Sequence, residues 1–166
     1  MENVIDQSGI LAISTRLQRL ADALRKDGQL IYQSFGIAFE PKWFPVVYTL
    51  HLKTSLSVVE IANEIGYAHP STISLLKELE KKQIIKSKKD KTDERKRLIM
   101  LTEKGKSLVT AMQPVWSNMQ KALSQIADNT NHLMKAIEEA EGKLKEYSFL
   151  ERSQMINKQN EKSPKN

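Results

Sequence analysis

The sequence predicts a mainly α-helical protein that carries one small β-hairpin, an α+β fold. Apolar residues recur every three or four positions over long stretches near both ends, as they do along one face of an amphipathic helix. Two shorter helical patterns lie between them, over residues 57–66 and 70–81. The following segment, residues 84–101, has β-forming residues at both ends and charged residues in the middle. That pattern is typical of a hairpin with a solvated tip.

The first predicted helix covers residues 10–31 and has a narrow apolar seam, of the kind that packs against partner helices. Pro41 begins a second, largely apolar helix that we expect to be buried. After the hairpin, Thr102 is a good N-cap for a long helix, and a last helix with apolar residues spaced by three and four follows from Leu133 to Tyr147. We expect the seams of the terminal helices to form an interface between two copies of the chain.

The two short central helices are expected to pack on each other because neither is long enough to be stable alone. Ser57 stands three residues before Glu60, the spacing of a capping box. Gly66 suits a left-handed C-cap, and Pro70 suits the first turn of the second helix. This is the pattern of a helix-turn-helix, whose second helix can enter the major groove of DNA.

The second of these helices carries small polar side chains near its start that can reach phosphates or base edges. The candidate DNA contacts are His69, Pro70, Ser71, Thr72, Ser74 and Lys77. The alternative interpretation is that Ser71 and Thr72 only cap the helix and that Lys77 is an ordinary surface lysine.

The hairpin region holds the whole basic excess of the chain. Residues 81–106 contain eleven Lys or Arg against four Asp or Glu, whereas the entire chain has a net charge of +6. Such a concentration is expected of a surface that contacts phosphates, although most charge runs are simply solvated. The candidate phosphate contacts are Lys88, Lys89, Lys91, Lys96 and Arg97.

The run DERKRLIMLTEKG holds Asp93, Arg95, Leu101, Thr102 and Gly105 at the offsets of the wing signature of the MarR family. The preceding segments SVVEIANEIG and PSTISLLKELEKKQII are similar to the helix-turn-helix of that family, including its recognition helix. The chain thus resembles, over roughly residues 8–148, these dimeric winged helix-turn-helix transcription regulators of bacteria and archaea.

The resemblance implies a single domain over residues 1–150. Its winged helix-turn-helix would cover about residues 40–102, between dimerisation helices at about 8–35 and 103–148. Residues 151–166 are polar and rich in Gln, Asn and Lys, and we expect a disordered tail there.

The resemblance also assigns roles to single residues. Arg95 matches the family's arginine that enters the minor groove, where narrow grooves concentrate negative potential, and Asp93 would orient it or hold the turn. Leu75 stands where many members have an arginine, which leaves the sequence preference open. Members often bind small aromatic or lipophilic effectors, and the residues that would line such a pocket are Tyr32, Phe35, Trp43, Phe44 and Met112. The alternative is that these residues belong to the core.

The sequence offers little support for other classes of function. It has no cysteine, which excludes disulfides and thiolate metal sites, and its three histidines are far apart. No glycine-rich phosphate loop, nucleophile elbow, secretory signal or membrane-spanning segment is visible. We therefore expect a cytoplasmic protein that is not an enzyme and holds no cofactor or metal.

Together these observations predict a homodimeric, sequence-specific regulator of transcription that binds a pseudo-palindromic operator in double-stranded DNA. Repression is favoured over activation, since it needs only occupancy of a promoter. The alternative is a protein-interaction module whose basic hairpin binds an acidic partner. A catalytic protein that uses the aromatic pocket is a weaker third option, because no acid or base is found for it.

Overall fold

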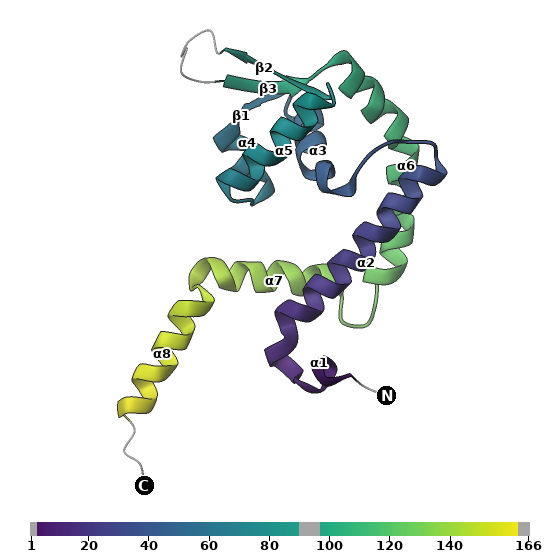
Figure 1. Cartoon of the computed structure of the whole chain (residues 1–166). Coiled ribbons are helices and arrows are strands. Elements are labelled where there is room, and N and C mark those ends of the chain that lie inside the picture. The colour runs from purple at the N-terminus through teal and green to yellow at the C-terminus, as the bar shows by residue number, and fades with distance from the viewer. Residues whose placement is uncertain (1–2, 90–96, 163–166) are drawn as a thin grey trace. The chain divides into compact units, whose positions relative to one another are not determined.

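The computed structural model describes residues 3–89 and 97–162, and Figure 1 shows its elements in chain order. Packing divides the chain into two units, Met1–Asn118 and Met119–Asn166, with the boundary inside a long helix. The first unit contains α1 Val4–Gln7, η1 Gly9–Ala12, α2 Ile13–Ser34, η2 Pro41–Trp43, α3 Phe44–Leu52, β1 Ser55–Ser57, α4 Val58–Ile65, α5 His69–Lys81, β2 Ile85–Lys89, β3 Arg97–Leu101 and the start of α6 Glu103–Ala127. The second contains the end of α6, α7 Leu133–Glu146 and α8 Phe149–Lys162. The predicted α+β class is confirmed.

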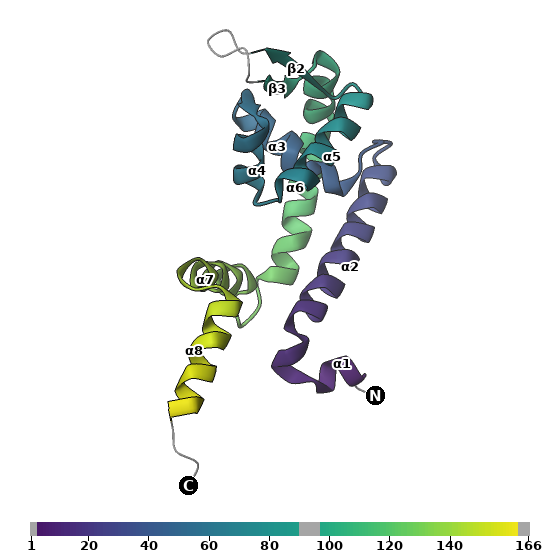
Figure 2. The same cartoon turned by 60° about the vertical axis from the view of Figure 1, so that its left-hand side comes forward.

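The core of the first unit lies among α3, α4, α5 and the sheet, which pack on one another (Figure 2). Its fully buried side chains come from elements far apart in sequence: Val46, Val47, Leu50, Ile61, Leu79, Met112 and Val115. Helix α3 was expected to be buried, but it is buried on one side only, through Val46, Val47 and Leu50, whereas Phe44, Tyr48 and Leu52 are exposed. The predicted first helix is interrupted near its start, so that η1 precedes α2, and it runs on to Ser34.

The sheet has three antiparallel strands in the order β1-β3-β2. The predicted hairpin is β2 and β3, with Ile85 opposite Leu101 and Lys89 opposite Arg97. Strand β1 was not predicted, because three residues are too few to show an alternating pattern. It pairs with β3 at Ser55–Met100, and so connects the segment before α4 to the wing.

The start of α6 is held against the base of the hairpin by Thr102. Its hydroxyl donates a hydrogen bond to the Gln83 carbonyl at 2.7 Å and accepts one from the Gly105 N–H at 3.0 Å, as an N-cap does. The Thr102 N–H donates to the Ile84 carbonyl at 3.0 Å. Gly105 is needed here, since a Cβ at this position would come closer than 3.0 Å to that same carbonyl oxygen. The predicted N-cap is therefore confirmed.

The second unit has no buried side chain among its described residues, so α7 and α8 present their apolar residues to solvent. The prediction of a disordered tail over residues 151–166 is wrong for 151–162, which are helical in α8; residues 163–166 lie outside the described chain. A capping box explains the start of α8. The Ser148 N–H donates to the Glu151 carboxylate at 2.7 Å, and the Glu151 N–H donates to the Ser148 hydroxyl at 3.2 Å.

Arg152 then ties the first turn of α8 to the end of α7. Its guanidinium donates hydrogen bonds to the carbonyls of Lys143 at 2.6 Å and Tyr147 at 3.1 Å, and the Lys143 carbonyl also accepts the Tyr147 N–H at 3.2 Å. It also lies 5.6 Å from the centre of the Tyr147 ring. The two hydrogen bonds join a side chain to the backbone, so the polar composition of the segment gave no sign of them.

Candidate nucleic-acid interface

The helix-turn-helix of α4 and α5 is built by the local signals that the sequence carries. The Ser57 N–H donates to the Glu60 carboxylate at 2.7 Å, and the Glu60 N–H donates to the Ser57 hydroxyl at 3.3 Å, which completes the predicted capping box. Gly66 ends α4 in the left-handed region with φ 67°. Pro70 lies in the first turn of α5, where its missing N–H has no helical partner to lose.

Helix α5 exposes the polar side of its first turns and buries the opposite side against α4 and β2. Five of the predicted contacts are exposed: His69, Pro70, Ser71, Ser74 and Lys77. Thr72 was predicted to contact DNA, but this is wrong, since its side chain is completely buried and its hydroxyl donates to the Ala68 carbonyl at 3.2 Å. A helix turns about 100° per residue, so Thr72 faces the core together with Leu76 and Leu79.

The far end of α5 is anchored by an ionic network. Lys42 donates to the carboxylates of Glu78 at 2.9 Å and Glu40 at 3.0 Å. The hydrogen bond from Lys42 lowers the pKa of Glu78, and the bonds to both carboxylates raise the pKa of Lys42. Beside them, the Lys82 ammonium lies 6.0 Å from the centre of the buried Trp43 ring. The network links α5 to η2 and leaves the exposed start of α5 unobstructed.

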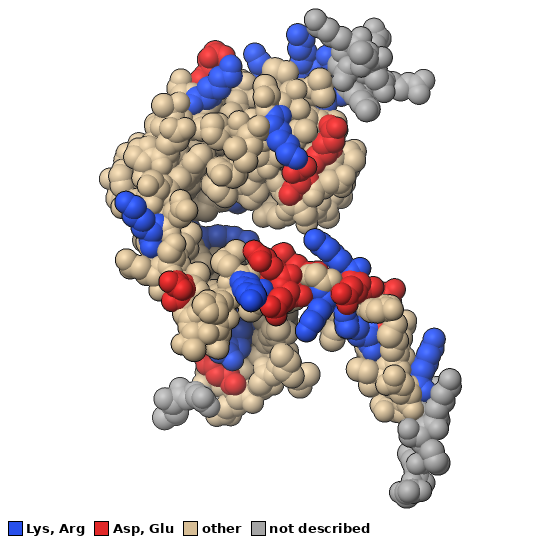
Figure 3. Space-filling view, turned by 180° about the vertical axis from the view of Figure 1, so that it is seen from behind, with Lys and Arg blue, Asp and Glu red and all other residues tan. Residues whose placement is uncertain are grey.

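The described part of the wing carries exposed cations at the ends of both strands. Lys88, Lys89 and Arg97 are exposed, and Figure 3 shows basic side chains beside the undescribed tip. Lys89 lies directly opposite Arg97 in the ladder, and like charges at such a position destabilise a strand pair. No described carboxylate forms an ion pair with these three side chains. A bound phosphate would relieve their repulsion. The remaining predicted wing contacts, Lys91, Asp93, Arg95 and Lys96, lie outside the described residues.

The aromatic residues predicted to line an effector pocket fall into two groups. Tyr32, Trp43 and Met112 are buried in the core, where Phe39 stands edge-on between the first two rings, whereas Phe35 and Phe44 are about half exposed. The groups are joined by the indole N–H of Trp116, which donates to the Tyr32 hydroxyl at 2.9 Å. Burial raises the pKa of that hydroxyl. None of the five lines either of the two pockets described below, and the effector pocket stays a prediction.

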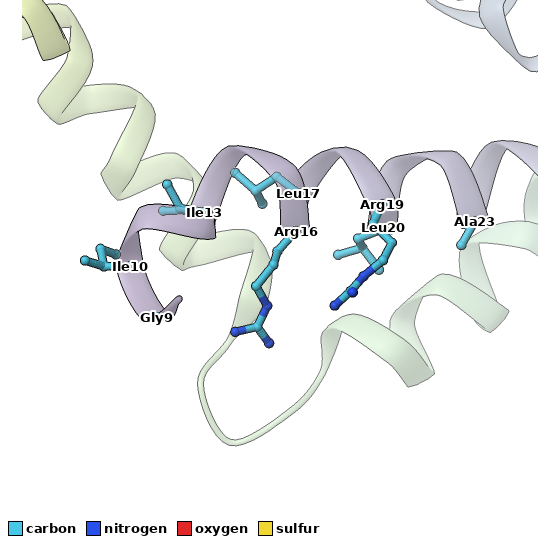
Figure 4. A pocket seen from close by; sticks show the side chains of 8 residues that line it. All are labelled: Gly9, Ile10, Ile13, Arg16, Leu17, Arg19, Leu20 and Ala23. Carbon is cyan, nitrogen blue, oxygen red and sulfur yellow. The ribbon is translucent and has the colours of Figure 1, made fainter. Parts of the chain in front are cut away.

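One of these pockets runs along the predicted N-terminal seam, over η1 and the first turns of α2. Figure 4 shows the apolar side chains of Ile10, Ile13, Leu17 and Leu20 along it, with Arg16 and Arg19 beside them. Both arginines form ion pairs with Asp6, at 3.7 Å and 2.6 Å. On α7, Leu144 is also 55% exposed. These exposed apolar residues lie on both stretches that the sequence predicted to form an interface.

Two general features of the described residues complete the description. None of the helices is both long enough and apolar enough to span a bilayer. Within the described ranges, no three His, Asp or Glu side chains gather as metal ligands would.

Comparisons with known proteins agree with this architecture. A family model described as "Transcriptional regulator SarA/Rot" matches residues 46–112, from α3 into α6. No curated protein matches the chain significantly. Among solved structures, the transcriptional repressor CouR bound to a 23-mer DNA duplex is similar with a TM-score of 0.68 and 20% identity, over 84% of this chain and 97% of that one.

Two further solved structures are similar at low sequence identity. A mutant MarR from E. coli in complex with operator DNA has a TM-score of 0.64 and 15% identity, over 84% of this chain and 99% of that one. NadR in complex with 4-hydroxyphenylacetate has a TM-score of 0.57 and 20% identity, over 80% of this chain and 91% of that one. Since the likeness covers nearly the whole of each of these proteins, the chain has the winged helix-turn-helix fold of the MarR-type transcriptional regulators.

Proposed function

We propose that the chain is a homodimeric regulator that binds double-stranded DNA in a sequence-specific way and represses transcription. One observation carries the proposal: the exposed polar start of α5 and the exposed cations of the β2–β3 wing belong to one winged helix-turn-helix. The helix would read base edges in the major groove, and the wing would contact the backbone. Its relatives in fold include CouR and MarR, both solved with DNA.

The homodimer is proposed because the chain leaves apolar side chains exposed at both ends. Leu17 is 51% exposed and Leu144 55%, and exposed apolar stretches of this kind mark interaction surfaces. A two-fold dimer would present two copies of α5 and so bind a pseudo-palindromic operator, with half-sites roughly 34–36 Å apart. Repression follows from occupancy alone. Such a regulator acts in the cytoplasm and is not an enzyme.

A small aromatic or lipophilic effector would regulate this protein only if it bound one spacing of the two copies of α5 better than the other. NadR, a relative in fold, was solved with 4-hydroxyphenylacetate. We propose that such a ligand acts at the aromatic residues around the hydrogen bond between Trp116 and Tyr32.

The decisive experiment is a selection of genomic DNA fragments by the purified chain at near-physiological salt, followed by sequencing. Enrichment of a pseudo-palindrome is the expected result. Equal recovery of all fragments would refute sequence-specific binding and favour the alternative, a module that binds an acidic protein. Salt dependence alone does not separate the two, because both depend on the same cations.

A matched pair of variants tests the wing itself. Lys88→Gln/Lys89→Gln/Arg97→Gln removes three wing cations, and the control Lys121→Gln/Lys135→Gln/Lys158→Gln removes three exposed lysines elsewhere. Each neutralised phosphate contributes about 0.9 to the slope of log affinity against log salt. We expect the wing variant to lose up to about 2.7 of that slope and the control to keep it. Equal losses would show that only net charge matters.

A further inference from the structure

A second pocket, a cleft of about 400 Å³, opens in the first unit between the end of α3, the base of the hairpin and the first turns of α6. Its apolar floor includes Leu50, Met100 and Val109, of which Leu50 and Val109 are buried. None of the described residues that line it belongs to α4 or α5. A ligand in this cleft would therefore leave the exposed start of α5 free.

The rim of the cleft is cationic. Lys86 reaches it from β2 and Lys106 from α6, and no Asp or Glu is among the described residues that line it. Lys86 lies directly opposite Met100 in the β2–β3 ladder, so both side chains stand on the same face of the sheet. This register is what brings a positive charge to the edge of an apolar surface.

Glu103, in the first turn of α6, is paired with Lys106, and its side chain is highly exposed. Lys106 forms an ion pair with Glu103 at 2.8 Å, and this contact lowers the pKa of Glu103. The charge of Lys86 lowers the same pKa by a smaller amount. Both lysines line the same cleft. Because this pair is exposed, solvent screens its charges, and a ligand that brings its own carboxylate can replace Glu103 at little cost.

We propose that this cleft binds a small aliphatic carboxylate, whose carboxylate lies between Lys86 and Lys106 and whose hydrocarbon chain covers Leu50, Met100 and Val109. An inorganic anion would leave the apolar floor in water, and a neutral lipid would leave both ammonium groups without a partner. The volume is near the lower end of ligand pockets, roughly 300–1,000 Å³, which favours a short chain. Among the described residues that line it, the one ring is the imidazole of His51, and most of the floor is aliphatic.

A ligand in the cleft would contact α3, both strands of the hairpin and α6 at once. The same hairpin carries Lys88, Lys89 and Arg97 on its strands. A carboxylate that favours one position of the hairpin over another would change the affinity for DNA. This regulatory consequence rests on the proposed function, whereas the binding of the carboxylate does not.

The test is a titration of the ¹⁵N-labelled chain, without DNA, with hexanoate, 1-hexanol and inorganic phosphate, followed by two-dimensional NMR. Hexanoate is expected to give saturable shifts of the amides of Met100, Lys106 and Thr110. Hexanol should bind at least about tenfold more weakly, because charge-assisted hydrogen bonds contribute about 1.5–3 kcal/mol. Phosphate should give no saturable shift at Met100. Hexanoate shifts confined to other parts of the chain, or none, would overturn the proposal.

Variants separate the cleft from general charge effects. Lys86→Gln/Lys106→Gln should weaken hexanoate binding at least about tenfold, and the control Lys121→Gln/Lys135→Gln should bind as the unmodified chain does. An unchanged thermal midpoint shows that each variant is folded. Equal affinity of the first variant and the unmodified chain would refute the cleft as the site. A failure to bind DNA would refute the proposed function alone, since the titration contains no DNA.

Discussion

Replacing Gly105 by alanine tests how the winged helix-turn-helix is joined to α6. In the middle of a helix this substitution ordinarily stabilises by about 1 kcal/mol, because alanine has the higher helix propensity. Here a Cβ would lie closer than 3.0 Å to the Ile84 carbonyl oxygen, 3.2 Å from its carbon and 3.3 Å from a methyl group of Leu101. We therefore expect Gly105→Ala to destabilise the protein.

The neighbour that would have to move is backbone, and it is already held. The Ile84 carbonyl accepts a hydrogen bond from the Thr102 N–H at 3.0 Å, and the Ile84 N–H donates to Leu79 at 3.0 Å. Inserting a methyl group into a packed site costs about 1–3 kcal/mol. Weakening two hydrogen bonds adds about 1 kcal/mol each. After subtracting the gain in propensity, we expect Gly105→Ala to lower the free energy of unfolding by about 2–4 kcal/mol.

The assay is thermal unfolding followed by circular dichroism, at one fixed protein concentration because a dimer's midpoint depends on it. The expected loss corresponds to a midpoint lower by roughly 4–16 °C for a chain of this size. Gly142→Ala in α7 is the matched control, since a Cβ there meets nothing within 4 Å. It should stabilise by about 1 kcal/mol. If Gly105→Ala were as stable as Gly142→Ala, α6 could not pack on the Ile84 carbonyl as described.

Three other outcomes are expected. Leu17→Glu or Leu144→Glu should convert the dimer to folded monomers in light scattering, and dimers that persist in both variants would show that the interface lies elsewhere. Arg95→Ala should weaken binding to every DNA sequence while leaving the proposed dimer and its midpoint of thermal unfolding unchanged. Unchanged affinity for DNA would show that this arginine does not contribute to binding. The hydrogen bonds from Ser148 lower the pKa of Glu151 below its ordinary value of 4.5, so the stability that they give to α8 is present above that value and lost as the pH falls through the lowered pKa. Helical circular dichroism should decrease in that range, and Glu151→Gln should abolish the decrease.

Local signals predicted the helix-turn-helix correctly, because their physics is local. The capping box of Ser57 and the left-handed Gly66 each depend on a few neighbouring residues, and both are found in the structure. The same kind of signal was present at Ser148 and Glu151, three residues apart, but the polar composition of the tail was given more weight. A capping box depends only on residues three apart, so the start of α8 is encoded locally in the sequence.

Other features depended on contacts between distant residues. Thr72 is buried because α5 packs against α4 and β2, and periodicity alone does not show which single residue ends up inside. The burial of Tyr32 and Met112 depends on packing between helices separated by about half the chain. Strand β1 exists because β3 offers it a partner edge. None of these could be read from residue type and spacing.

By itself, the sequence determined the fold class, the helix-turn-helix, the hairpin and the concentration of positive charge on it, because helix caps, periodicity and net charge depend on short-range order or on composition. Only the tertiary structure decided which face of α5 is exposed, that Gly105 lies against the Ile84 carbonyl, and that Lys86 and Lys106 line one cleft with an apolar floor. These features arise where α3, the sheet and α6 pack together, and a side chain's surroundings there are set by residues far from it in sequence.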